Sequence, residues 1–541
     1  MTLLADILGG VFHGALLVSL ALVLGGVAWS FWGLRPWQGR MPRTAVARSV
    51  ILLQTGAFAL ALCQAALLAL TAGALSDALG SGRIGDFFLT AHFAAGATRT
   101  ALALGVGVAA WWLGREPLSS ARWITLSALA LVLAVSGGWL THASSRVEGA
   151  APLMALTVLH QVGALVWAGA LFHLAATWRL TRRDPDVQSA WPGLVSRFST
   201  LALASMLLLI LPALPLAWTY AGSLGSLVGT AYGSLILLKS LLLGAALVLA
   251  AFNFAAARRR DAVSSSSPLR TRVPYLVEGE VILAVMIVFT AAALSDQPPS
   301  TDIRTADQAT VREVGEVFRP KLPSLRSPSL EEMRQERARP AGEARTVTAY
   351  RWSNFSHNVA GLILLFMAGV ALAGALRQAT WERYWPLGFV AMAAFIYLRA
   401  AANDGVWPFG SATRSPLDAE GLQHFLAAFL VLGLGVFEWR ARSTGAGQRP
   451  WRWVFPALAM AGGVLLLTHS HTAFEAKPSF LVQVTHTTIG ALAGLIAASR
   501  WLELRLPPPG GRLAGAVAAG AMLAIALVLV FYREANVALP E

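Results

Sequence analysis

Apolar runs of twenty or more residues recur along this chain from one end to the other. A run of that length can cross a bilayer core of roughly 30 Å as an α-helix that rises about 1.5 Å per residue. The composition agrees, because 56% of the 541 residues are hydrophobic and only 13% are charged, where soluble domains carry about 25% charged residues. The sequence therefore predicts an all-α polytopic membrane protein in contact with a lipid bilayer.

About fourteen apolar windows are long enough to span the membrane, and we expect them in an eight-plus-six arrangement. They lie near residues 9–32, 50–72, 95–114, 122–141, 152–176, 199–219, 232–256, 276–294, 355–376, 385–401, 422–438, 453–469, 480–499 and 513–532. The segment 296–351 separates the two groups and is polar, with several prolines, arginines and glutamates. We predict transmembrane modules over residues 1–295 and 352–541, joined by a linker over 296–351.

Basic residues are distributed unevenly between the two sets of loops. The loops that follow odd-numbered spans hold 24 of them, against 7 in the opposite short segments. Because basic residues collect in cytoplasmic loops, this predicts that both termini and the 296–351 linker lie outside the cytoplasm. The same bias explains the net charge of +14 without a nucleic-acid partner.

Sequence motifs of common soluble enzymes are missing. The chain has no Walker-type GxxxxGK[ST] loop, no aspartyl-phosphorylation motif and no GxSxG elbow. Its single cysteine, Cys63, excludes an internal disulfide framework and a thiolate cluster. We expect neither ATP-driven transport by this chain alone nor enzyme activity, and so no catalytic residues.

Nine of the ten histidines are predicted to face the outer half of the membrane, with His173 as the exception. Ionisable groups inside membranes are costly and suggest function, and imidazole is a common ligand of copper, zinc and iron. We therefore treat the nine as candidate metal ligands: His13, His92, His142, His160, His357, His424, His469, His471 and His486.

The positions of four histidines refine this hypothesis. His160 is predicted to lie about 12 Å below the outer surface, and His486 is six residues into its span, so these two are the deepest candidates. His469 and His471 are two residues apart and would diverge by about 200° on a helix, so they share one metal only where the helix has ended.

The donor set leaves two kinds of site open. A nearly all-histidine site suits Cu(II), Zn(II) or two-coordinate Cu(I), whereas methionine and cysteine favour Cu(I). Two facing histidines could instead ligate haem and make the chain a membrane redox protein. His160 and His173 are about 220° apart around one helix, which disfavours a two-haem arrangement but leaves a single outer haem open.

Two charged residues within apolar spans also attract attention. Lys239 is predicted about 12 Å inside its span, where a charged form lining a pore would oppose cation flow. Glu280 begins a span at its inner end, and we expect it to pair with Arg197 or another arginine of that side.

Three motifs in succession resemble the copper resistance protein D (CopD) family. They are Leu159-His-Gln-Val-Gly-Ala-Leu-Val-Trp-Ala-Gly-Ala-Leu, Ser196-Arg-Phe-Ser-Thr-Leu-Ala-Leu and Ala231-Tyr-Gly-Ser-Leu-Ile-Leu-Leu-Lys. The resemblance covers residues 1–296 and makes 1–295 a CopD-like eight-helix module. It matches His160 to a helix histidine of the family and Lys239 to its lysine.

The second half is similar to the C-terminal extension of longer members of that family. The similar stretches are Asn354-Phe-Ser-His, Val406-Trp-Pro, Gln423-His, Phe437-Glu-Trp-Arg, Leu467-Thr-His-Ser-His and Thr485-His-Thr. The resemblance thereby matches the extension's pattern to five histidines of this half: His357, His424, His469, His471 and His486.

The resemblance implies a bacterial inner-membrane protein of copper homeostasis, with a periplasmic linker and both termini in the periplasm. It implies uptake or relay of copper ions from the periplasm, often with a CopC-like copper donor. No CopC-like β-domain is fused here and the outer face is poor in methionine, which argues for a separate donor. The alternatives are the haem-binding redox protein and a copper-delivery or assembly factor for a membrane oxidase.

Overall fold

The computed structural model describes residues 2–34, 43–80, 84–117, 119–257, 271–338, 346–377, 383–410, 419–444, 450–467 and 477–534. Within these ranges every regular element is a helix, which confirms the predicted all-α class. Thirteen helices are long and apolar enough to cross a membrane. The predicted span 385–401 corresponds to α15 (Leu387–Asp404), which is not among the thirteen because polar residues occupy its end.

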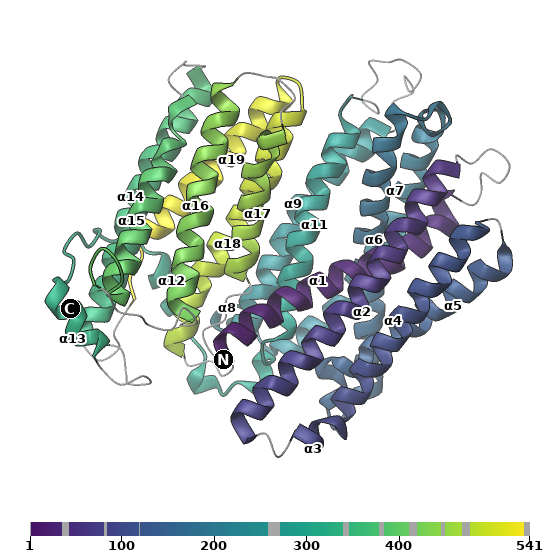
Figure 1. Ribbon diagram of the computed structural model, residues 1–541, viewed down its shortest axis with the longest axis horizontal. Helices are drawn as coiled ribbons and strands as arrows, with labels where there is room; N and C mark the ends of the chain where they lie inside the picture. The colour runs from purple at the N-terminus through teal and green to yellow at the C-terminus, as the bar shows by residue number, and fades with distance from the viewer. Residues whose placement is uncertain are drawn as a thin grey trace. The chain divides into compact units, whose positions relative to one another are not determined.

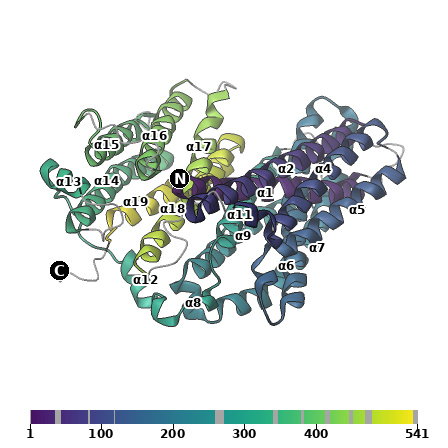
Figure 2. The ribbon, with the colours of Figure 1, turned by 60° about the horizontal axis from the view of Figure 1, so that its bottom comes forward.

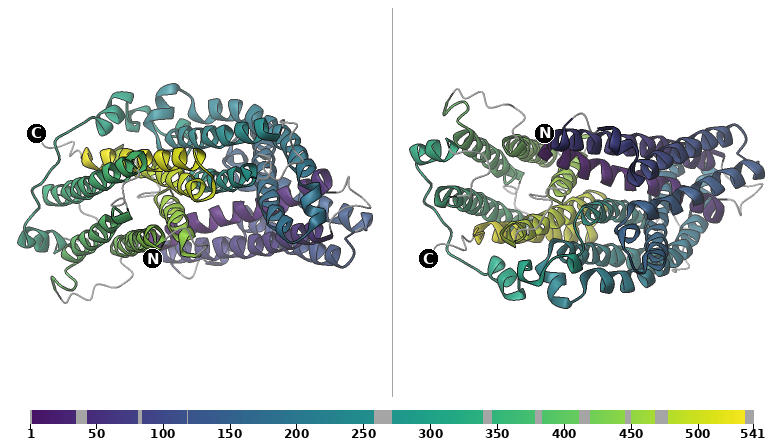
Figure 3. Two further views of the ribbon diagram at one scale, coloured as in Figure 1. Left: turned by 90° about the horizontal axis from the view of Figure 1, so that it is seen from above. Right: turned by 90° about the horizontal axis from the view of Figure 1, so that it is seen from below.

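The chain divides into two compact units, and unit 1 comprises Met1–Leu227 and Leu235–Ile303. Its helices are α1 (Thr2–Trp29), the π-helical turn η1 (Ser30–Leu34), α2 (Arg43–Leu79), α3 (Ile84–Phe88), α4 (Ala91–Arg115), α5 (Ser120–Ser136), η4 (Gly137–Leu140), η5 (His142–Ser145), α6 (Ala150–Trp178), η6 (Arg179–Arg182), α7 (Pro185–Ala221), most of α8 (Leu224–Gly229) and α9 (Ala231–Ala257), α11 (Val273–Ser295) and η7 (Ser300–Asp302). Figure 3 shows α1, α2 and α4 running alongside one another in purple to blue.

Helix α1 occupies the centre of unit 1, because it packs against α2, α6 and α11. Its approach to α6 depends on two glycines. A Cβ atom at Gly169 would lie 1.8 Å from the Ala21 carbonyl oxygen, and one at Gly25 would lie 2.4 Å from the Ala170 nitrogen. Only small residues allow membrane helices to meet this closely, so these glycines fix where α6 and its histidines lie.

Unit 2 comprises Val228–Ser234 and Arg304–Glu541. Its helices are η8 (Thr305–Asp307), α12 (Val311–Phe318), α13 (Leu330–Arg337), α14 (Val347–Arg377), α15, α16 (Ala419–Ser443), η10 (Pro450–Trp453), α17 (Val454–Leu467), α18 (Lys477–Arg505) and α19 (Gly510–Val530). The six long helices α14 to α19 form a bundle in which sequence neighbours pack together and α14 also packs against α19 (Figure 1).

The polar segment between the modules contains two short capped helices of unit 2. Each begins with a capping box, Thr310 with Glu313 on α12 and Ser329 with Glu332 on α13, in which side chain and backbone satisfy one another's free groups. Helix α12 lies beside α18 (Figure 2), and its Val314 joins an apolar cluster with Phe480. This segment therefore packs on the α18 end of the bundle.

The α14–α19 contact sets the geometry of the candidate site in unit 2. A Cβ atom at Gly361 would lie 2.5 Å from the Val530 nitrogen, so the two backbones touch. The Asn358 amide on α14 donates hydrogen bonds of 3.0 Å to the carbonyl oxygens of Leu529 and Tyr532. These bonds hold the end of α19 against the first turns of α14, where His357 lies.

Candidate metal-binding residues

Two predicted ligands meet inside unit 2, at the end of the bundle where α14 and α18 begin. The ring centroids of His357 and His486 are 5.8 Å apart, and the rings are perpendicular. Tyr532, just after α19, stacks on His357 with centroids 4.1 Å apart. Helices α14 and α18 and the residues after α19 thus place two imidazoles and a phenol ring together. We call His357 and His486 the histidine pair.

Both rings of the histidine pair are anchored in the same way. The Nδ1 atom of His357 lies 2.9 Å from the Ser353 carbonyl oxygen, and that of His486 lies 3.0 Å from the Val482 carbonyl oxygen. A carbonyl only accepts hydrogen bonds, so each Nδ1 carries the proton and each Nε2 carries the lone pair. In metal sites of known proteins, a backbone bond of this kind orients the ring so that its other nitrogen binds the ion.

The residues after α19 support the pair and were not identified from the sequence. Tyr532 donates a 2.7 Å hydrogen bond to the Glu534 carboxylate, which also accepts a 2.6 Å bond from Ser353 Oγ. The backbone N–H of Glu534 donates to Asn354 at 2.8 Å. The one sequence signal was a tyrosine and a carboxylate just beyond the last apolar run, on the side predicted to carry the histidines.

His424 lies on the same side of the bundle but has a different neighbour. Its ring makes an edge-on contact with Trp352, with centroids 5.8 Å apart. In the described part of the chain, no three His, Cys, Asp or Glu side chains come close enough together to hold one metal ion. The pair therefore offers two imidazole ligands, and His424 does not complete a three-ligand site.

In unit 1, His13 and His142 both border the end of α11. His13 Nδ1 lies 3.0 Å from Asp296 Oδ1, and the His142 ring hydrogen-bonds the backbone of Ser295. Burial lowers the pKa of His142, which favours the neutral form that binds metals. Next to them Arg146 forms a two-bond ion pair with Asp302, at 2.7 and 2.9 Å.

His160 is held inside unit 1 by a helix that proline distorts. Its Nδ1 lies 2.8 Å from the Leu209 carbonyl oxygen on α7, three residues before Pro212, and an internal proline disturbs the carbonyls of the preceding turn. Lys239 on α9 lies within electrostatic range of His160. The two residues that the family resemblance singled out are therefore neighbours, but the lysine charge opposes cation binding there.

Three other candidates stand apart from these groups. His92 is exposed at the start of α4 and contacts Phe87 at 6.5 Å between centroids. His469 and His471 lie outside the described residues. His173 is fully buried, with Nε2 3.0 Å from the Leu22 carbonyl oxygen and in the position that a Gly26 Cβ would need, which is a packing role.

The expected ion pair between Glu280 and Arg197 is wrong for the described residues. Glu280 on α11 is 1% exposed and accepts a short hydrogen bond from the Asn253 amide of α9. Arg197 instead donates to the Trp32 carbonyl oxygen at 3.2 Å. An amide partner removes the need to bury a second charge beside the carboxyl group.

Comparison with known proteins places part of the chain in a family. Residues 192–294, which include α7, α9 and α11 of unit 1, match the family model described as copper resistance protein D. The chain is also 30% identical over 140 residues to a Bacillus subtilis (strain 168) protein named copper transport protein CutJ, a match that covers 26% of this chain and 24% of that protein. No solved structure matches.

The matched region contains no histidine, so the candidate ligands come from other parts of the chain. Its ionisable residues within helices include Lys239, Glu278 and Glu280. The family match and the histidine pair are thus independent observations, one in unit 1 and one in unit 2. As its motifs predicted, the chain thus carries a region over residues 192–294 that matches copper resistance protein D.

Proposed function

We propose that this protein handles copper in the membrane, with the histidine pair His357–His486 as its main copper-binding site. The observation that carries the proposal is that both rings are anchored through Nδ1 and that their centroids lie 5.8 Å apart. Two neutral imidazoles suit copper. The copper resistance protein D match and the name of the similar protein CutJ support copper as the cargo.

The surroundings of the pair support binding that is both oriented and reversible. Tyr532 stacks on His357 and restricts its ring, while Glu534 holds Tyr532 and Ser353 in place. Two protein ligands leave coordination positions open, so a donor or acceptor group can exchange the ion. His160 is a secondary site in this proposal, because the Lys239 charge raises the cost of placing a cation beside it.

Copper uptake or relay from the periplasm, with the ion delivered by a separate CopC-like donor, is the activity we assign to this site. A copper-delivery role toward a membrane oxidase uses the same residues without net transport. Cellular copper accumulation distinguishes the two. Loss of the pair lowers accumulation in the uptake case, whereas it leaves accumulation unchanged and reduces oxidase loading in the delivery case.

The decisive test measures metal content and absorption spectra of the purified full-length protein. We expect copper after incubation with Cu(I) under reducing conditions, and loss of most of it in His357→Ala/His486→Ala. Thr488→Ala, on α18 two residues from His486, is the matched control because it removes only a hydroxyl bonded to Val484. A Soret band with stoichiometric iron, or full copper retention in the double variant, would overturn the proposal.

A further inference from the structure

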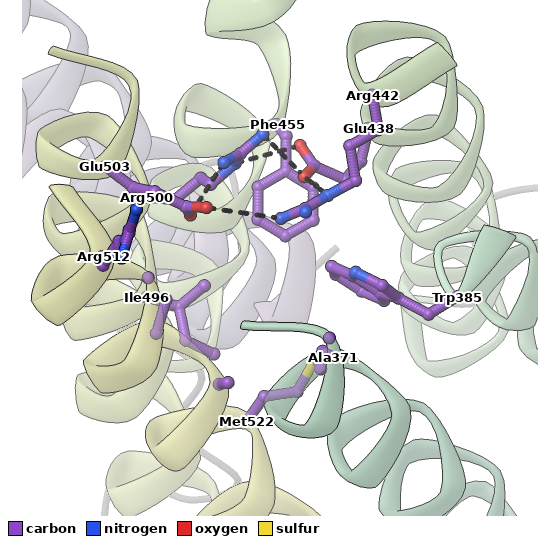
Figure 4. Close-up of a pocket in the computed structure, with 14 residues that line it drawn as sticks. Ala371, Trp385, Glu438, Arg442, Phe455, Ile496, Arg500, Glu503, Arg512 and Met522 are labelled. Carbon is purple, nitrogen blue, oxygen red and sulfur yellow. Dashed lines mark hydrogen bonds and ion pairs between the residues drawn. The ribbon is translucent and has the colours of Figure 1, made fainter. Parts of the chain in front are cut away.

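A charged pocket lies at the other end of unit 2, where α16 and α18 end and α19 begins. It has a volume of about 170 Å³, and α14, α16, α17, α18, α19 and Trp385 all contribute to its wall (Figure 4). Glu438 and Arg500 each follow a candidate histidine of the same helix, His424 and His486, by fourteen residues. The pocket is therefore about 21 Å along the helices from the histidine pair.

Four of its side chains form a closed chain of ion pairs. Glu438, fully buried, pairs with Arg442 at 2.6 Å and with Arg500 at 2.9 Å. Glu503 pairs with Arg500 at 2.7 Å and lies 3.8 Å from Arg442. Two carboxylates and two guanidinium groups balance one another here, and such pairing is what makes buried charges tolerable.

A fifth charged residue breaks that balance. Arg512, in the first turn of α19, also lines the pocket, and no ion pair of Arg512 is present among the described residues. The pocket wall thus carries three guanidinium groups and two carboxylates, an excess of one positive charge.

Hydrogen-bond donors are in excess as well. A guanidinium group has five N–H donors and no acceptor. In the described structure Arg442 uses only Nε in a hydrogen bond, to Glu438, since its 3.8 Å contact with Glu503 is too long for one. Its side chain is 17% exposed, and its other donors form no hydrogen bond within the described part of the chain.

The rest of the wall is apolar and includes the aromatic rings of Trp385 and Phe455. Figure 4 shows the ion pairs on one side of the pocket and Ala371, Ile496 and Met522 on the other. Helix α19 begins at Gly510, so the positive end of its dipole lies near Arg512. A group that suits this wall carries one negative charge, several acceptor oxygens and an adjoining apolar part.

We propose that this pocket binds a phosphate-type oxyanion between Arg442 and Arg512. Arginine forks match the geometry of phosphate oxygens, and one added negative charge neutralises the excess. Glu438 lies five residues before the end of α16, a depth of about 7.5 Å that the headgroup of an anionic phospholipid reaches. Free inorganic phosphate offers the same chemistry, and the experiment below distinguishes a lipid headgroup from free phosphate.

The test uses the delipidated full-length protein and two probes. Native mass spectrometry measures binding of phosphatidylglycerol, with phosphatidylcholine as the zwitterionic comparison, and equilibrium dialysis measures binding of inorganic phosphate. Arg512→Gln removes the excess charge without touching the ion pairs. Arg505→Gln is the matched control, because Arg505 stacks on Trp453 and Trp501 and does not line the pocket.

We expect Arg512→Gln to weaken binding of the preferred probe by about tenfold, the usual effect of losing one charged hydrogen bond, and Arg505→Gln to leave it unchanged. Preference for phosphatidylglycerol identifies a headgroup site, and binding of phosphate alone identifies a soluble ligand. Equal binding by the wild type and Arg512→Gln, or no binding of either probe, would overturn the proposal. Copper content stays unchanged in Arg512→Gln, so this outcome is independent of the copper site.

Discussion

The two units hold their histidines in different ways. In unit 1 each histidine has its own neighbour: His13 an aspartate, His160 a carbonyl of α7, and His173 a carbonyl of α1. In unit 2 His357 and His486 face each other, and each is anchored by its own helix. Because each of these rings hydrogen-bonds a carbonyl of its own helix, it can approach a histidine of another helix.

The region that resembles a known family and the two histidines that face each other lie in different parts of the chain. The region that matches copper resistance protein D lies mostly in unit 1 and has no histidine, whereas the histidine pair lies in unit 2. We infer that copper binding depends more on unit 2 and that unit 1 contributes His160 as a secondary site, which the charge of Lys239 weakens. The predictions below test this division.

Removing the histidine pair gives the largest expected effect on copper. His357→Ala/His486→Ala deletes both imidazoles, and we expect at least about 100-fold weaker copper affinity, since even supporting residues of metal sites account for 10–100-fold. His160→Ala in unit 1 is expected to weaken affinity much less. Competition with a copper chelator measures both, and an equal or larger loss in His160→Ala would reverse the order of the two units.

Adding a Cβ atom at a close-packed glycine should disturb the packing of one unit at a time. Gly169→Ala places a Cβ atom 1.8 Å from the Ala21 carbonyl oxygen in unit 1, and Gly361→Ala places one 2.5 Å from the Val530 nitrogen in unit 2. Overpacking of this kind costs about 1–3 kcal/mol. We expect both variants to unfold at lower temperature, but only Gly361→Ala to weaken copper binding.

Gly105→Ala controls for the glycine experiment, because no atom lies within 4 Å of a Cβ at that position. Thermal unfolding in detergent and chelator competition on the same samples provide the two measurements. Weaker copper binding in Gly169→Ala, with unit 2 still folded, would show that copper binding also depends on the packing of unit 1.

The aromatic support of the pair gives a smaller effect. Tyr532→Ala removes the ring stacked 4.1 Å from His357, and we expect about tenfold weaker copper affinity from the loss of orientation. Tyr532→Phe keeps the ring and loses the 2.7 Å hydrogen bond to Glu534, so its affinity should stay near that of the wild type. Identical losses in the two variants would assign the role to the hydroxyl and Glu534 instead.

The smallest effect concerns the surface pair that ties α12 to α18. Lys477 hydrogen-bonds Glu313 at 2.7 Å and holds the pKa of that carboxyl at about 2, below its usual 4.5. A depressed carboxyl pKa stabilises the folded state above about pH 4.5, and the effect is lost as the pH falls toward 2. The pair is 31% and 40% exposed, so its contribution is small.

Glu313→Gln should therefore lower the unfolding temperature slightly at pH 7, and the difference from the wild type should shrink below pH 4.5. Glu316→Gln is the control, because among the described residues Glu316 pairs with Arg319, an exposed residue three positions further along the chain. A difference that is the same at pH 7 and pH 3.5 would contradict the ion-pair explanation.

The sequence by itself determined the fold class and the positions of the helices. Each predicted span overlaps a described helix, although several helices are longer: 50–72 lies in α2 (Arg43–Leu79), 199–219 in α7 (Pro185–Ala221) and 355–376 in α14 (Val347–Arg377). This succeeds because a bilayer demands about twenty apolar residues in one continuous helix, which is a local property of the chain. The family motifs are also continuous stretches of the chain, so the resemblance could be identified from the sequence.

Only the tertiary structure decided which side chains meet. His357, His486 and Tyr532 are each more than forty residues from the next in the sequence, and nothing local joins them. The same holds for Glu438 with Arg500 and for Glu280 with Asn253. The physical reason is that close glycine contacts such as Gly169 on Ala21 and Gly361 on Val530 set the register between helices, and that register determines every contact across the bundle.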